Sequence, residues 1–182
     1  MAIEITTPLT KETISQLKSG DIVSINGTIL TARDAAHKKF IQILESGETL
    51  PIDIKDQIIY YVGPCPSPAR NVIGSCGPTT SSRMDAYTPK LIELGLGGMI
   101  GKGLRNKEVC DSITTHKSIY FAAVGGLGAL ISQRIVSQEI ILFPELGPEA
   151  VRKLTVKNFP AIVIIDSFGN NLYESGKKAY AK

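Results

Sequence analysis

The sequence predicts a layered α/β domain. Strand patterns dominate the early part of the chain, and the middle alternates short apolar strands with helical periods, an order typical of α/β layers. With 182 residues, 43% of them hydrophobic and 20% charged, the chain is long enough for one sizeable core and short for two. No repeat, low-complexity tract or linker divides it, which predicts a single domain over residues 1–182.

The first half of the chain is expected to contain two helices and a strand, over Leu9–Lys18, Arg33–Glu45 and Ile58–Val62. Thr10 is the candidate cap of the first helix, and Gly20 follows its end. Apolar and polar residues alternate over Asp21–Thr31 around Asn26–Gly27, a dipeptide typical of two-residue turns. We therefore expect a β-hairpin centred on Asn26–Gly27.

The second half continues the alternation of strands and helices. The expected helices cover Met84–Leu94 and Asn106–His116, and the expected strands cover Gly98–Ile100, Ile119–Val124, Ile140–Phe143 and Ala161–Ile165. Asp166–Asn171 is rich in turn residues. Leu172–Tyr173 is expected to return from this turn as the second strand of a hairpin.

The most informative segment is Gly74–Asp85. It holds two glycines, a proline, four hydroxyl residues in a row and Arg83, a composition that makes a poor core. A glycine-rich turn that enters a helix leaves several backbone N–H groups unpaired near one point. Arginine can grip a carboxylate or phosphate at two points. We therefore expect an anion site here, with a helix beginning near Gly77–Pro78.

Two other positively charged residues, Arg33 and Lys102, stand in segments that are also predicted to be loops or loop ends. Arg33 and Asp34 stand at a predicted strand-to-helix junction, and Lys102 lies between two glycines, which let a backbone approach a ligand closely. Together, Arg33, Arg83 and Lys102 could neutralise a small dicarboxylate. Each also has another interpretation: Arg33 could pair with an acidic neighbour, Arg83 could bind helix carbonyls, and Lys102 could be solvated.

Other classes of function find little support in the sequence. The net charge of +3 comes from 20 basic and 17 acidic residues without a dense basic run, so nucleic-acid binding is not indicated. Gly95–Gly103 and Gly126–Gly128 lack the glycine spacing of dinucleotide loops, and Lys102 lacks the Ser or Thr that follows the lysine of a phosphate loop. His37 and His116 form no zinc motif, and no acyl-transfer triad is visible.

The cysteines and the N-terminus bear on location. Cys65, Cys76 and Cys110 lack the close spacing of zinc or iron–sulfur motifs, and we interpret them as buried or loop cysteines, although they could converge in the fold. Their odd number argues against a disulfide framework. The first residues form no signal peptide, and the apolar stretches fall short of the about 20 residues of a membrane helix. The expected location is cytoplasmic.

Four separated motifs carry a family resemblance. They are Thr31–His37, Gly63–Pro66, Gly77–Asp85 and Gly101–Gly103, which stand in the order and approximate spacing of the class I fumarases. The chain resembles, over nearly its whole length, the C-terminal domain or separate β subunit of these iron–sulfur hydro-lyases, which include the L-tartrate dehydratases. The resemblance implies a swivelling β/β/α domain with a mixed sheet.

The resemblance also implies roles for individual residues. The positions that match the family's carboxylate-binding residues are Arg33, Arg83 and Lys102. Thr79 matches the proposed catalytic base and Thr80 an adjoining substrate contact, while Asp34 and His37 are candidates for support. A threonine base needs activation, for which a helix N-terminus and a partner carboxylate are candidates. The other interpretation of Thr79 is a helix N-cap, and that of His37 is a packed side chain.

The cofactor implied by the resemblance is a [4Fe–4S] cluster held by cysteines of a different polypeptide, the α subunit, with no metal ligand on this chain. One of its irons would bind the substrate as a Lewis acid. The expected function is that of a fumarate hydratase β subunit, which interconverts fumarate and L-malate only with its α subunit. The alternatives are an L-tartrate dehydratase β subunit and, in another class, a non-catalytic dicarboxylate-binding domain.

Overall fold

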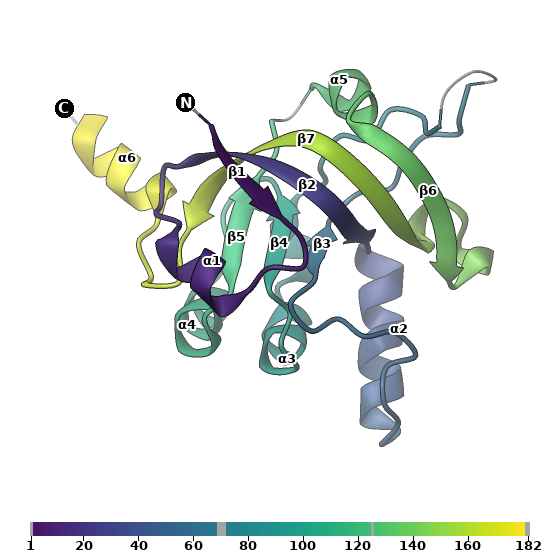
Figure 1. Ribbon diagram of the computed structural model, residues 1–182. Helices are drawn as coiled ribbons and strands as arrows, with labels where there is room; N and C mark the ends of the chain where they lie inside the picture. The colour runs from purple at the N-terminus through teal and green to yellow at the C-terminus, as the bar shows by residue number, and fades with distance from the viewer. Residues whose placement is uncertain (1, 69–71, 125, 181–182) are drawn as a thin grey trace.

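The computed structural model describes residues 2–68, 72–124 and 126–180 (Figure 1). Its strands are β1 (Ile3–Thr6), β2 (Ile22–Thr31), β3 (Ile58–Tyr60), β4 (Gly98–Gly101), β5 (Ile119–Ala122), β6 (Ile135–Leu142) and β7 (Val151–Ile165). Its α-helices are α1 (Lys11–Gln16), α2 (Asp34–Glu45), α3 (Thr88–Glu93), α4 (Lys107–His116), α5 (Gly128–Ser132) and α6 (Leu172–Tyr180). Short 3-10 helices cover Ser81–Met84 and Pro144–Glu149.

The strands form one seven-stranded mixed sheet in the order β1-β2-β3-β4-β5-β7-β6. Strands β1 to β5 pair in parallel with their neighbours, whereas β7 runs antiparallel to β5, β6 and β2. Because β7 pairs with both β2 and β5, strands β2, β3, β4, β5 and β7 form a closed circuit of pairings. The α/β prediction with a mixed sheet is confirmed.

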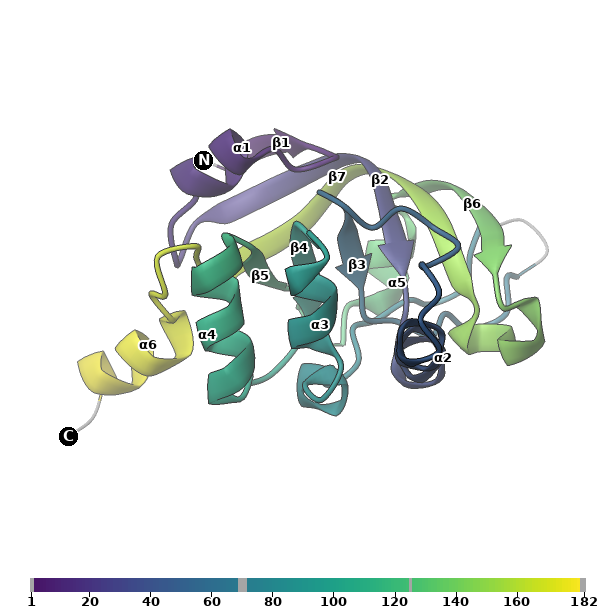
Figure 2. The same cartoon turned by 90° about the horizontal axis from the view of Figure 1, so that it is seen from below.

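Two apolar cores lie on the two faces of the parallel strands. Successive side chains of a strand point to opposite faces, so Ile58 and Tyr60 of β3 enter one core and Ile59 enters the other. The first core includes side chains of β2 and β7. The second contains side chains of α2, α3 and α4, which cover this face (Figure 2). The result is a β/β/α arrangement of layers.

The hairpin expected at Asn26–Gly27 is wrong, because β2 runs straight through this dipeptide. Its register against β7 shifts between Ile25 and Gly27, which is a β-bulge. Gly27 has a φ of +105°, and a Cβ there would lie 2.6 Å from the hydroxyl of Thr7. The Asn26 side chain accepts a hydrogen bond from the Asn158 amide. The positive-φ residue therefore serves a bulge between paired strands.

The helix expected over Met84–Leu94 is divided. A 3-10 helix ends at Met84, and α3 begins only at Thr88, with Pro89 in its first turn. Proline has no N–H to donate, so it fits the first turn of a helix and disrupts an interior position. The other predicted helices are confirmed with shifted ends, and Thr10 caps α1 by accepting a hydrogen bond from the Thr13 amide at 3.1 Å.

The C-terminal hairpin is also wrong, because Leu172 begins α6. Asn171 accepts a hydrogen bond from the Tyr173 amide at 3.1 Å, so it starts a helix instead of a returning strand. Before it, the Asp166 carboxylate accepts hydrogen bonds from the amides of Phe168 and Asn170, which forms the predicted turn. The expected strands Ile140–Phe143 and Ala161–Ile165 correspond to the ends of the longer strands β6 and β7.

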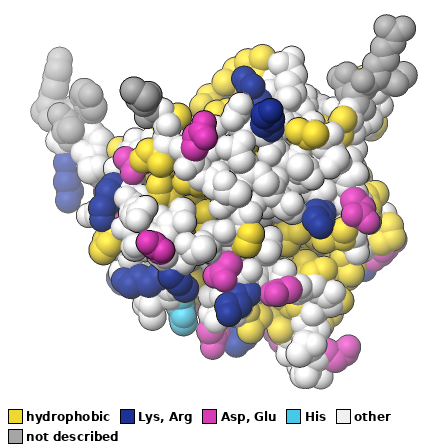
Figure 3. All heavy atoms as spheres, viewed as in Figure 1, with side chains coloured by type: hydrophobic (Ala, Val, Ile, Leu, Met, Phe, Trp, Pro, Cys, Tyr) yellow, Lys and Arg dark blue, Asp and Glu magenta, His cyan; other side chains and the backbone are white. Residues whose placement is uncertain are grey.

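Two observations bear on nucleic-acid binding and on membrane insertion. On the face drawn in Figure 3, basic and acidic side chains are mixed and separated by apolar ones, so this face carries no stripe of positive charge. Among the described residues, no helix has both the length and the apolar character needed to cross a membrane.

Candidate functional site

The carboxyl ends of three parallel strands bring residues from three of the sequence motifs to one edge of the sheet. Arg33 lies two residues after β2, Gly63 three residues after β3, and Lys102 directly after β4. Because these strands are parallel, their carboxyl ends meet at the same edge. In α/β sheets this edge is the usual place for a ligand.

The Thr79–Ser81 segment lies along this edge. The Thr79 amide donates to the carbonyl of Tyr61 at 2.8 Å, and the Ser81 amide donates to the carbonyl of Lys102 at 2.9 Å. Thr80 and Lys102 form an isolated parallel bridge. The fold thus joins the predicted base and its neighbour to the ends of β3 and β4, and both Thr80 and Lys102 are exposed.

Arg33 and Arg83 meet at one carboxylate. The Nε atom of Arg33 lies 3.1 Å from Oδ2 of Asp34, and the Nε atom of Arg83 lies 2.7 Å from Oδ1 of the same group. One carboxylate oxygen of Glu149, Oε1, lies 3.5 Å from Nε of Arg33. The other, Oε2, accepts a hydrogen bond from the Ala35 amide at 2.7 Å. Asp34 therefore supports both arginines, and Glu149 is a supporting residue that the sequence analysis missed.

The ionisation of Asp34 fits this supporting position. Burial by itself would raise the pKa of its carboxyl group. Hydrogen bonds from its own backbone amide and from Arg33 act in the opposite direction, as do the positive charges of Arg83 and Arg33. The net result is a pKa below the usual value of an aspartate. Asp34 is therefore negatively charged at neutral pH. It holds the Nε atoms of the two arginines, and among residues 2–68, 72–124 and 126–180 the terminal nitrogens of both side chains have no hydrogen-bond partner.

The glycine before Lys102 is required by a close approach of two segments. A Cβ on Gly101 would lie 2.0 Å from Oγ of Ser81 and 2.9 Å from the ring of Tyr61. Gly103, on the other side of Lys102, has a φ of +84°, which favours glycine. The two glycines let the backbone approach the Thr80–Ser81 segment closely.

The helix expected to begin near Gly77–Pro78 is absent. The 3-10 helix starts after Thr80, whose side chain makes no capping hydrogen bond, so Thr79 is not a helix N-cap either. Within the described residues, no hydrogen bond involves the hydroxyl group of Thr79 or Thr80. A helix dipole therefore does not activate Thr79, since a single 3-10 turn has too few aligned peptides.

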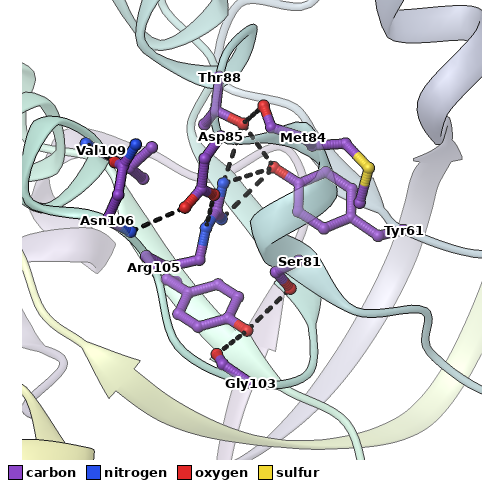
Figure 4. A network of polar contacts seen from close by, with 10 residues as sticks. Tyr61, Ser81, Met84, Asp85, Thr88, Gly103, Arg105, Asn106 and Val109 are labelled. Atoms are coloured by element: carbon purple, nitrogen blue, oxygen red, sulfur yellow. Dashed lines mark hydrogen bonds and ion pairs between the residues drawn. The ribbon is translucent and has the colours of Figure 1, made fainter.

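A buried polar network that the sequence analysis missed lies behind the site (Figure 4). Nε of Arg105 is 2.6 Å from Oδ1 of Asp85, and Nη2 donates to Thr88 at 2.9 Å. The other carboxylate oxygen of Asp85 accepts the Asn106 amide at 2.7 Å. The Arg105 side chain is fully buried. The sequence gives no sign that Arg105 and Asp85 form a buried ion pair, because the two residues lie twenty positions apart and are brought together only by the fold.

His37 is fully buried, so it can act on the site only through its neighbours. Nδ1 lies 3.0 Å from the carbonyl oxygen of Arg33, which can only accept, and Nδ1 therefore carries the proton. Nε2 is buried without a hydrogen-bond partner in the described residues. Burial is the main reason that the pKa of His37 falls to about 4, and the positive charge of Arg105 adds to the effect.

This shifted pKa predicts a stability that depends on pH. Between pH 6.5 and 4 the unfolded chain binds a proton at His37 that the folded chain does not, so stability is lost as the pH falls through this window. We expect the free energy of unfolding to be about 2 kcal/mol lower at pH 5 than at pH 7. Urea denaturation at the two pH values measures it. In His37→Gln, most of this difference should disappear; an equal pH dependence would contradict the assignment.

The three cysteines occupy different environments. Cys65 is exposed, Cys76 is buried and Cys110 is half-buried on α4. Burial raises the pKa of the Cys76 thiol to about 12, with a smaller effect of Cys65, so this thiol stays protonated. In residues 2–68, 72–124 and 126–180, no group of three or more His, Cys, Asp or Glu side chains is placed to share a metal ion.

Comparison with known proteins gives one family. The family model described as "Fumarase C-terminus" matches residues 1–176. The chain is 44% identical over 181 residues to the protein named "Putative L(+)-tartrate dehydratase subunit beta" of Methanocaldococcus jannaschii, covering 96% of this chain and 93% of that one.

Two longer proteins are similar over the same region. The aerobic class I fumarate hydratase of Escherichia coli is 41% identical over 170 residues, which are 90% of this chain and 31% of that protein. Fumarate hydratase 2 of Leishmania major is 40% identical over 166 residues, which are 90% of this chain and 29% of that protein. The chain thus spans nearly all of the first relative and less than a third of the two fumarate hydratases.

Proposed function

Because this chain belongs to the fumarase C-terminus family, we propose that it supplies the carboxylate-binding half of a hydro-lyase active site. The observation that carries the proposal is the edge of the sheet where Lys102, Thr79 and Thr80 lie together and where Asp34 holds Arg33 and Arg83. Positive side chains beside an unengaged hydroxyl suit a dicarboxylate that must lose a proton next to one of its carboxylates.

The proposed roles follow from these positions. Arg33, Arg83 and Lys102 bind the substrate carboxylates, and Thr80 is an adjoining contact. Thr79 removes the proton from the carbon next to one carboxylate in the direction of dehydration. Positive charge near that carboxylate stabilises the second negative charge that develops on it. A free threonine hydroxyl is a very weak base, so a further proton acceptor must activate Thr79.

A partner polypeptide completes the site in this proposal. Thr80, Arg83 and Lys102 are exposed, whereas a bound small molecule is usually buried over most of its surface. The exposed apolar side chains of Val124, Leu127 and Leu130 lie within four residues of Gly128, the first residue of α5, and Gly128 closely approaches Gly77, two residues before Thr79. Such patches often mark protein contacts. The partner would cover the substrate and supply the acceptor for the proton of Thr79.

The [4Fe–4S] cluster proposed for the reaction belongs on that partner. The described cysteines of this chain do not fit as ligands of such a cluster. The Cys76 thiol is buried and protonated, whereas Cys65 is exposed and Cys110 is half-buried on α4. We therefore assign this chain no ligand to the cluster. Its own contribution is to bind and orient the diacid and to move one proton.

Fumarate hydration to L-malate is the proposed reaction, in line with the fumarate hydratases that match most of this chain. L-Tartrate dehydration is a second candidate. It is favoured by the 44% identity to a protein named as a separate tartrate dehydratase subunit, whose length this chain matches. A non-catalytic dicarboxylate-binding domain is the alternative of another class, and it would bind its ligand without a partner.

An anaerobic assay of the chain with its cluster-bearing partner tests the proposal. We expect fumarate to be consumed only in the mixture, because each component alone holds half of the site. Each component alone and a mixture with L-tartrate are the controls. Turnover of tartrate but not fumarate would support the second candidate. A formed complex with an intact cluster that converts neither diacid, together with dicarboxylate binding by this chain alone, would favour the binding domain.

A further inference from the structure

Tyr120 of β5 joins the two segments that carry the proposed base and Lys102. Its hydroxyl oxygen lies 2.8 Å from Oγ of Ser81 and 2.9 Å from the carbonyl oxygen of Gly103. The Tyr120 side chain is fully buried. A single hydroxyl group therefore bridges the Thr79–Ser81 segment and the Gly101–Gly103 loop from below the surface.

The direction of both hydrogen bonds follows from their chemistry. The Gly103 carbonyl can only accept, so the Tyr120 hydroxyl donates to it, and the Ser81 hydroxyl donates to the oxygen of Tyr120. Burial is the main cause that raises the pKa of Tyr120, so the group keeps the proton that this chain of donors needs. Both hydroxyl protons of the bridge are therefore donated within it.

The two segments are also joined at a second place. Asp85 binds the side chain of Arg105 and the amide of Asn106, four and five residues after Gly101. That contact joins the two segments away from the site. Thr80 and Lys102 lie at the site, where they form an isolated parallel bridge and the Ser81 amide donates to the Lys102 carbonyl. The bridge through Tyr120 therefore acts next to the substrate-binding residues.

We propose that the hydroxyl group of Tyr120 positions the active site by holding Thr79 and Lys102 at the separation at which both reach one substrate. This inference rests on the proposed function. Tyr120 is buried and does not touch the substrate, so it acts through the Lys102 loop and through Ser81. Its loss should loosen the loop while the sheet and both cores remain, because the aromatic ring stays in place.

Tyr120→Phe tests the proposal in two measurements. In the full chain without its partner, hydrogen exchange at the Ser81 amide should become about five- to ten-fold faster, because the bridge next to it loses the hydroxyl group that makes both of its hydrogen bonds. In the assembled enzyme, KM for the diacid should rise about ten-fold. The same change in a Lys102→Ala background should raise KM little further, since residues that act as one unit give non-additive effects.

Ser118→Ala is the matched control. Ser118 directly precedes β5, two residues before Tyr120, and its buried hydroxyl donates to the carbonyls of Leu96 and Gly97 at 2.9 and 3.0 Å, away from Ser81 and Gly103. Its removal should lower thermal stability about as much as Tyr120→Phe does, yet leave Ser81 exchange and KM unchanged. Ser81→Ala breaks the same bridge from its other side and should reproduce the effects of Tyr120→Phe.

Two results would overturn the positioning role. One is unchanged Ser81 exchange in both Tyr120→Phe and Ser81→Ala, and the other is a KM effect that simply adds to that of Lys102→Ala. If the assembled wild-type enzyme converts neither fumarate nor tartrate, the proposed function fails separately. The exchange measurement then still decides whether Tyr120 holds the two segments together.

Discussion

Turnover by the assembled enzyme is expected to fall about 10²- to 10⁴-fold in Thr79→Ala, the range that a positioned general base contributes. The fold should be retained, because the hydrogen bond that Thr79 makes in the described structure comes from its backbone amide, to Tyr61 at 2.8 Å. Alanine keeps that bond. Steady-state kinetics of the complex, with a binding assay for the two polypeptides, measures both effects.

Two variants control this prediction. Thr79→Ser keeps a hydroxyl group and should recover a large part of the turnover. Ser82→Ala removes an exposed hydroxyl from the neighbouring 3-10 helix and should leave the rate unchanged. Full activity in Thr79→Ala would remove Thr79 as the base. A complex that no longer forms would show instead that the residue serves the interface.

The free energy of unfolding is expected to fall by about 3–5 kcal/mol in Asp85→Asn, because the buried Arg105 then lacks a compensating charge. The Asp85 side chain is 7% exposed and that of Arg105 is 0% exposed, so water cannot replace the lost partner. A loss of this size is a large part of the total stability of a domain. Urea denaturation of the chain, at constant m-value, gives the change directly.

An exposed pair in the same region provides the control. Asp111 pairs with Lys107 one turn away on α4, in solvent, so Asp111→Asn should change the stability little. Arg105→Met combined with Asp85→Asn should recover much of the loss, since it removes the unpaired charge. A single Asp85→Asn variant as stable as wild type would mean that the pair contributes nothing net to folding.

The periodic parts of the fold were predictable from local pattern. Helix α2 has apolar residues at helical spacing, strands β3 to β5 are short apolar runs, and α4 was predicted with nearly its observed bounds; the structure confirms all five elements. The errors fall where local and tertiary preferences differ. Asn26–Gly27 suits a tight turn, but β2 pairs through this dipeptide with β1 on one side and β7 on the other, and the dipeptide becomes a bulge.

The candidate site was predictable only as a set of residue types. Arg33, Arg83 and Lys102 stood out because glycine-rich or helix-start loops surround them. That Asp34 joins the two arginines, and that Glu149 approaches from a segment more than a hundred residues away, depends on the closed circuit of strands. Their roles toward a substrate stay predictions.

By itself, the sequence determined the α/β class, most helices of the second core and the motifs that mark the family. These features depend on neighbours within a few residues, because helix and strand periods and turn chemistry are local. Only the tertiary structure decided that Thr80 meets Lys102, that Tyr120 bridges Ser81 and Gly103, and that Arg105 is buried on Asp85. Such contacts join residues distant in the chain, and their strength comes from burial, which no local pattern encodes.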